Sequence, residues 1–244
     1  MSATQMAEFV YRRAGHCPVC EQDVEFRSPQ AWYRDFLVCS GCGSIPRERA
    51  LAYVLSNQFP DWRGLSIHES SPSDRGVSRK LKQECAAYVA TQFFVEQPLG
   101  AMNNGFRNEN LERQTFGDAQ FDLVVTLDVM EHVNQPELVL KEVARTLKSG
   151  GAYIFTAPTY KDRVKSERRA LYKPDGTIEH FAPHPEYHGN PVSDAGSLVT
   201  FHYGYDLAEL MHSWSGMDVE VRRFHDHNHG IIGDFTEVYV CRKA

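Results

Sequence analysis

The apolar and polar positions between residues 121 and 157 form two kinds of segment. Residues 123–127 carry four apolar side chains and one polar one, Thr126, as is typical of a parallel strand covered on both faces. Residues 136–147 have apolar side chains at helical spacing, with Pro first and Lys-Ser-Gly-Gly after the last turn. A second apolar run at 152–157 predicts another strand. Strand, helix and strand in this order predict a βαβ unit with a right-handed crossover.

The same patterns predict the other elements of an α/β fold. Helices are expected at 46–59, 77–84 and 205–213, and strands at 64–69, 86–93, 107–111, 217–224 and 235–241. Residues 97–105 are rich in turn-forming types and show no helical pattern.

Composition limits the class of protein further. A chain of 244 residues with 42% hydrophobic residues suits one medium-sized domain plus a small appendage. The net charge of −6 argues against a large nucleic-acid surface. Because no apolar run could cross a bilayer and the N-terminus lacks the apolar core of a signal peptide, we expect a cytoplasmic protein with no membrane segment.

Four cysteines near the N-terminus have the spacing of a metal site. Cys17 and Cys20 form one CxxC pair, and Cys39 and Cys42 form another. Paired CxxC turns in a reducing compartment predict a four-thiolate zinc ribbon, here assigned to residues 1–46. Four thiolates leave no open position for water, so the zinc is expected to be structural. The alternative is two unrelated turns.

Candidate chemistry lies at the end of the central strand. Asp128, Glu131 and His132 follow it directly, at the edge where open α/β sheets place their ligands. We therefore expect the functional site at this carboxyl edge.

The residues around this edge also carry a resemblance to a known family. FDLVVTLDVMEHV at 121–133 and LKEVARTLKSGGAYIFTAP at 140–158 resemble the fourth strand, its crossover helix and the fifth strand of class I, type 11-like S-adenosylmethionine-dependent methyltransferases. The resemblance implies a Rossmann-like sheet of seven strands over residues 47–244. That sheet would be mostly parallel, with an antiparallel last strand at its edge.

The resemblance also implies where the cofactor binds. The family's glycine-rich loop corresponds to residues 70–76, where only Gly76 is a glycine and serines replace the others. The ribose position, commonly a carboxylate in the family, is Gln92. The implied cofactor-binding residues are Glu69, Ser70, Ser71, Gln92, Asn110, Leu111 and Asp128.

Residues 158–204 form an insertion too long for a simple connector. Loops of this length in compact domains are usually lids or binding surfaces, so we expect this one to contact the acceptor. Pro183 and Pro185 interrupt the histidines around them and predict a loop. The candidate catalytic bases are His132, His180, His184, His188 and His202.

The function that these features favour is methyl transfer from S-adenosylmethionine to a hydroxyl or amine of a small-molecule or glycan-type acceptor. A non-catalytic S-adenosylmethionine- or nucleotide-binding protein with a structural zinc ribbon is the alternative. A nicotinamide oxidoreductase would need G-x-G-x-x-G after residue 69, and a radical enzyme would need three cysteines spaced for an iron–sulfur cluster; neither pattern is present. The sequence does not identify the acceptor, the methylated atom or whether the protein forms a homo-oligomer.

Overall fold

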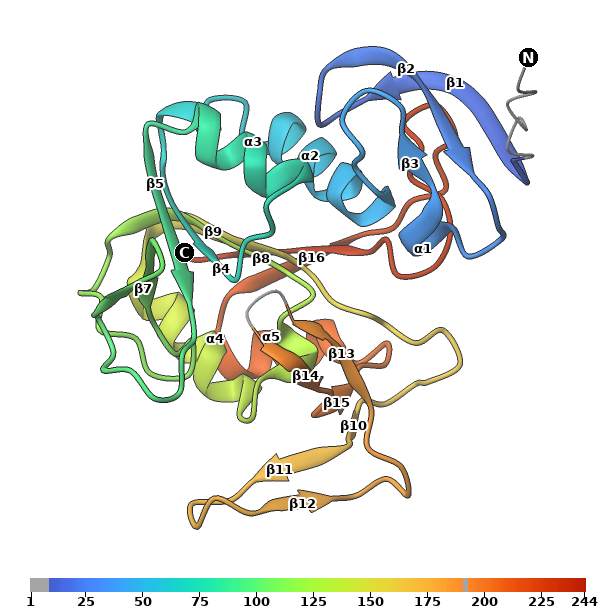
Figure 1. Ribbon diagram of the computed structural model, residues 1–244. Coiled ribbons are helices and arrows are strands. Elements are labelled where there is room, and N and C mark those ends of the chain that lie inside the picture. Colours follow the sequence, from blue (N-terminus) through green and yellow to red (C-terminus); the bar gives the residue numbers. More distant parts are fainter. Residues whose placement is uncertain (1–8, 191–192) are drawn as a thin grey trace.

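The computed structural model describes residues 9–190 and 193–244. The first eight residues of the predicted ribbon domain and residues 191 and 192 of the predicted insertion lie outside the described residues. Figure 1 shows one large sheet with helices on both faces and the N-terminal strands beside one end of it.

The large sheet is mixed and has eight strands in the described part of the chain. Its order is β16-β17-β9-β8-β4-β5-β7-β6. The strands are β4 (Ser66–Ser70), β5 (Ala87–Gln92), β6 (Met102–Asn103), β7 (Phe106–Asn108), β8 (Phe121–Leu127), β9 (Leu147–Thr156), β16 (Asp218–Arg222) and β17 (Val238–Arg242). All neighbours from β7 to β9 are parallel. The predicted α/β fold with a mostly parallel sheet is confirmed, with β8 at its centre.

The predicted number of seven strands was wrong because of a tight hairpin. Asn104 and Gly105 have φ angles of 49° and 81° and join β6 to β7. An Asn-Gly pair with two positive φ angles is a preferred two-residue hairpin loop, and it adds β6 antiparallel to β7 at the sheet edge.

The last strand is antiparallel, as predicted, but it does not lie at the edge. β17 pairs antiparallel with both β9 and β16. Its side chains from Val238 to Cys241 are all buried, whereas β16 alternates between exposed and half-buried positions. The burial pattern explains this strand order. β17 is buried on both faces, as expected of a strand with a neighbour on each side, whereas the alternating β16 can form the edge.

Helices cover the two faces of the sheet. They are α2 (Pro46–Gln58) and α3 (Gly76–Glu84) on one face and α4 (Pro136–Thr146) and α5 (Leu207–Ser215) on the other, with the short α1 (Tyr33–Phe36) near the N-terminal strands (Figure 1). Leu123 and Val125 of β8 pack under α2 and α3, and Val124 packs with α4. This alternation is the period of two of a strand with both faces covered.

The N-terminal strands β1 (Tyr11–Cys17), β2 (Gln22–Ser28) and β3 (Val38–Cys39) form a separate antiparallel sheet. Their apolar residues nevertheless belong to the same buried cluster as α2 and the loop before β17. Gly230 of that loop lies against Phe26, where a Cβ would come within 2.6 Å of the ring. The N-terminal sheet therefore packs as part of the main core.

The insertion contains short strands where the sequence predicted a loop. They are β10 (Glu167–Arg168), β11 (Ala170–Tyr172), β12 (Ile178–His180), β13 (Tyr187–Asn190), β14 (Ser193–Leu198) and β15 (Phe201–His202), paired as β10-β15, β11-β12 and β13-β14. In Figure 1 the β11-β12 hairpin extends away from the body, while β13, β14 and β15 lie close to it. None of the described helices is long and apolar enough to span a membrane.

One buried histidine makes the stability of this fold depend on pH. His68 in β4 is fully buried, packs against Phe116 and Phe121, and its Nε2 lies 2.8 Å from the Thr91 hydroxyl. Burial lowers the pKa of His68 to about 3. The unfolded chain binds this proton near pH 6.5. The folded state therefore has no penalty from His68 above pH 6.5. Below this pH the unfolded chain is protonated first, so the free energy of unfolding decreases as the pH falls toward 3.

We expect His68→Gln to flatten the acid side of the stability profile. Between pH 6.5 and 4.5 the parent should lose up to about 1.4 kcal/mol per pH unit more than the variant. Urea unfolding across this range measures the difference. In the exposed His184→Gln variant, the unfolding free energy should fall with pH as steeply as in the parent. An equally steep fall in His68→Gln would contradict the assignment of this pH dependence to His68.

Candidate functional site

The four predicted zinc ligands converge on one point. Their Sγ atoms all lie within 4.8 Å of one another, with Cys17 to Cys42 at 3.8 Å and Cys20 to Cys39 at 3.9 Å. A tetrahedral zinc with bonds of about 2.3 Å separates its sulfur ligands by about 3.8 Å. Hydrogen bonds with Cys39 and Cys42 lower the pKa of Cys17, and hydrogen bonds with Cys17 and Cys42 raise the pKa of Cys39. The geometry fits a closed four-thiolate zinc site.

A buried arginine ties this cluster to the rest of the chain. Arg49 in α2 donates to the backbone carbonyls of Leu37 at 2.9 Å and Gly230 at 2.7 Å, and also to the carbonyl of Ser44. The Ser44 hydroxyl lies 3.2 Å from Cys42 Sγ. One side chain therefore holds the second cysteine turn, α2 and the loop before β17 together. Arg49 therefore braces the second cysteine turn.

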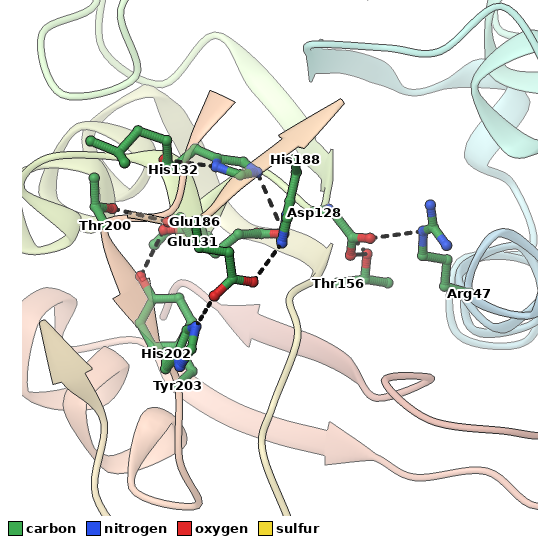
Figure 2. Close-up of polar contacts among 12 residues, drawn as sticks. Arg47, Asp128, Glu131, His132, Thr156, Glu186, His188, Thr200, His202 and Tyr203 are labelled. Carbon is green, nitrogen blue, oxygen red and sulfur yellow. Dashed lines mark hydrogen bonds and ion pairs between the residues drawn. The ribbon is translucent and has the colours of Figure 1, made fainter. Parts of the chain in front are cut away.

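Asp128, expected near the reactive end of the cofactor, has three strong partners. Its Oδ2 accepts from Arg34 at 2.6 Å. The same oxygen lies 2.8 Å from Arg47, and Oδ1 accepts from the Thr156 hydroxyl at 2.9 Å (Figure 2). Arg34 lies in α1 and Arg47 in α2, so the N-terminal region reaches the end of β8. Burial lowers the pKa of Arg47, but the charge of Asp128, the hydrogen bond and charge of Asp35 and the charge of Glu48 together outweigh burial, and the pKa is raised. The carboxylate is an anchor for two guanidinium groups.

The loop after β4 takes the place of the family's glycine-rich turn. Ser70 is buried and Ser71 has a φ of 58°, a left-handed backbone that favours glycine. The Glu69 carboxylate accepts from the Ser78 hydroxyl at 2.5 Å and the Tyr88 hydroxyl at 2.7 Å, and burial raises the pKa of Glu69 to about 7. Two hydroxyls from α3 and β5 thus hold Glu69, and Ser71 supplies the backbone turn without a glycine.

The two other expected contact regions lie at the ends of β5 and after β7. Gln92 ends β5, is mostly buried, and lines a cavity of about 600 Å³ with Ser73, Tyr88 and Phe106. Asn110 uses its side-chain oxygen to accept from the Glu112 backbone at 2.8 Å, in a local turn. Leu111 is buried beside it. The cavity lies where no crossover helix connects β5 to β7, so strand faces that a helix would cover stay open.

His132 lies in the 3-10 turn η2 (Met130–His132) directly after β8. Its Nδ1 lies 3.0 Å from the Leu198 carbonyl, which can only accept, so this nitrogen carries the proton when the ring is neutral. Burial lowers the pKa of His132 to about 4. The Thr200 amide donates to the Glu131 carbonyl at 2.8 Å, and the Tyr203 hydroxyl donates to the Met130 carbonyl at 2.8 Å. The returning strand of the insertion therefore holds η2 in place.

Glu186 brings two insertion histidines to the same place. Its Oε1 lies 3.1 Å from His188 Nε2, and its Oε2 lies 2.7 Å from His202 Nε2 (Figure 2). The rings of His188 and His132 meet edge to face at 5.0 Å, and the Tyr160 ring stacks on His202 at 4.3 Å. Three of the five predicted base candidates thus lie in one cluster. The other two, His180 and His184, are exposed on the β11-β12 hairpin and the loop after it.

Several residues of this site were missed from the sequence. Arg34 and Arg47 lie in the predicted ribbon and its following helix, and Glu186 is one acid among many in a segment interpreted as loop. The only local signal was the position of Glu186 two residues before His188, which places two side chains on the same side of a strand.

Comparison with known proteins agrees with the architecture. Residues 79–155 match the family model described as "Methyltransferase domain". A Mesorhizobium loti S-adenosylmethionine-dependent methyltransferase is similar in structure, with 14% identity, a TM-score of 0.52, and coverage of 80% of this chain and 98% of that one. Streptomyces venezuelae DesVI gives 11% identity, a TM-score of 0.50, and coverage of 81% and 91%. No curated protein matches the sequence.

A third similar structure comes from a two-protein assembly. A chain of the Haloferax volcanii complex between the Trm112 methyltransferase activator and a methyltransferase has 14% identity and a TM-score of 0.51, covering 80% of this chain and 89% of that one. Residues 79–155 thus match a methyltransferase family model, and the three structures show that the chain has the fold of S-adenosylmethionine-dependent methyltransferase domains. In this chain the domain is combined with an N-terminal four-cysteine cluster and a histidine-bearing insertion.

We expect freshly purified protein to contain one zinc ion per chain. Cys17→Ser removes one of four thiolates and should lower both the zinc content and the melting temperature, since metal binding contributes folding free energy. Elemental analysis and thermal unfolding measure the two effects. Cys85→Ser, a buried cysteine outside the cluster, is the control for zinc content. Metal-free parent protein would refute the site.

Proposed function

We propose that the protein transfers a methyl group from S-adenosylmethionine to a hydroxyl or amine of a small-molecule or glycan-type acceptor. The observation that supports this acceptor chemistry most is the polar cluster at the end of β8. There the insertion adds Glu186, His188 and His202 to His132, at the edge where α/β sheets bind ligands. In this proposal the four-cysteine cluster holds a structural zinc.

The backbone at this edge supports cofactor binding. Ser71 and Asp128 are the first residues after β4 and β8, two adjacent parallel strands, and both have positive φ angles, of 58° and 51°. A non-glycine residue in this conformation costs about 1 kcal/mol or more, and such strain clusters at functional sites. We assign Glu69, Ser70 and Ser71 to the methionine part of the cofactor and Gln92 to the ribose. Asn110 and Leu111 are assigned to the adenine, and Asp128 faces the reactive, methyl-bearing end.

The reaction requires little covalent chemistry from the protein. The acceptor lone pair forms a bond to the methyl carbon while the carbon–sulfur bond breaks and its electron pair returns to sulfur, leaving S-adenosylhomocysteine. A hydroxyl acceptor must also lose a proton, and positioning plus a base are the contributions expected from side chains.

His202 is the best placed base among the described histidines. Its Nε2 points to Glu186 at 2.7 Å, so the carboxylate orients the ring, and its Nδ1 has no hydrogen-bond partner among the described residues. Burial lowers the pKa of His202, which favours the neutral ring that can accept a proton. Tyr160 stacks on the same ring and encloses it. The insertion thus acts as a cover that also supplies the base.

We expect His202→Gln to lose methyl transfer to a hydroxyl acceptor by at least about 100-fold, the usual contribution of a general base. An acceptor is first found by intact-mass screening of hydroxyl and amine compounds and oligosaccharides. Turnover is then measured with labelled cofactor, next to calorimetric binding of S-adenosylmethionine, which should be unchanged.

The exposed His184→Gln is the matched control and should keep full turnover. Equal turnover of His202→Gln and the parent would exclude His202 as the base. Cofactor binding with no transfer to any acceptor would instead favour the alternative of a non-catalytic S-adenosylmethionine-binding protein.

A further inference from the structure

We propose that Glu131, His132 and His188 form a binding site for a divalent transition-metal ion, separate from the four-cysteine cluster. One carboxylate oxygen and two imidazole nitrogens from these residues lie within 4.8 Å of one another. Glu131 and His132 come from η2 and His188 from β13 of the insertion, so the site joins the sheet edge to its cover (Figure 2).

The hydrogen bonds of both histidines leave a lone pair for a metal. His132 Nδ1 faces the Leu198 carbonyl and His188 Nε2 faces the Glu186 carboxylate, and both of these partners are acceptors. Each neutral ring must therefore carry its proton on the anchored nitrogen. The free nitrogens, His132 Nε2 and His188 Nδ1, both point toward Glu131 Oε1, at 3.8 Å each. Metal-binding histidines are commonly held in this way by a carbonyl or a carboxylate.

Glu131 is the strongest sign that a ligand is required. The residue is 1% exposed, and neither carboxylate oxygen has a hydrogen-bond partner among the described residues. A buried carboxylate without partners is costly, and buried charges are usually paired or bound to metals. Glu131 Oε1 lies 3.8 Å from each of the two free nitrogens, which is too long for a hydrogen bond. Two metal–ligand bonds of about 2.1 Å can span up to about 4.2 Å.

The ligand set indicates the class of metal. Two imidazoles and one carboxylate suit divalent ions such as Mn²⁺, Fe²⁺, Co²⁺ or Zn²⁺ and leave coordination positions open. His188 is about a third exposed, which gives an entry path. If the proposed methyl transfer is correct, an open position would take the acceptor hydroxyl oxygen and lower its pKa. This second step rests on the proposed function, whereas metal binding does not.

The test uses full-length, zinc-loaded protein titrated with Mn²⁺, which thiolate sites bind poorly. Free Mn²⁺ is counted by electron paramagnetic resonance, without cofactor or acceptor. We expect one Mn²⁺ per chain, with nitrogen coupling in the pulsed spectrum. Glu131→Gln and His188→Ala should each weaken binding at least tenfold, while His184→Ala, from the same insertion but exposed, should bind like the parent.

Melting temperatures show whether each variant is folded. If Glu131→Gln is unfolded, His188→Ala decides, because its partly exposed ring can be removed with less effect on packing. Parent protein without a bound Mn²⁺, or equal binding by the parent and folded His188→Ala, would overturn the proposal. Methyl transfer that persists without bound metal would overturn the activation of the acceptor by the metal and leave the proposed function intact.

Discussion

The ion pairs of Asp128 with Arg34 and Arg47 are the contact on which the site depends. They join α1 and α2 from the N-terminal region to the first residue after the central strand. All three side chains are no more than 16% exposed, so loss of one partner would leave a buried charge, at a cost of about 3–5 kcal/mol. Because Asp128 has a left-handed backbone, these contacts also stabilise the turn that leads into Glu131 and His132.

A second set of contacts fixes the other side of the site. Thr200 and Tyr203, on the returning part of the insertion, bind the backbone carbonyls of η2. Glu186 then connects His188 and His202 across the cover. The end of β8 is thus held between the N-terminal region and the insertion, and neither is a detachable appendage of the sheet.

The sequence predicted those parts whose causes are local. Period-two and period-3.6 patterns located β8, α4 and β9, and the CxxC spacing located four cysteines that do converge. The Asn104-Gly105 pair was also a local signal, but the strands that it joins, Met102–Asn103 and Phe106–Asn108, are too short to show an alternating pattern. Arg34, Arg47 and Glu186 could not be predicted in this way. Their partners are 94, 81 and 16 residues away, and only tertiary packing and strand register bring them together.

Calorimetric titration of S-adenosylmethionine into the full chain tests the central claim most directly, that this edge binds the methyl donor. The account predicts one site per chain, with weaker binding by Asp128→Ala and Asn110→Ala and unchanged binding by Asp118→Ala, whose exposed carboxylate lies away from the carboxyl edge. Absence of heat with folded parent protein, or parental affinity in both Asp128→Ala and Asn110→Ala, would contradict it.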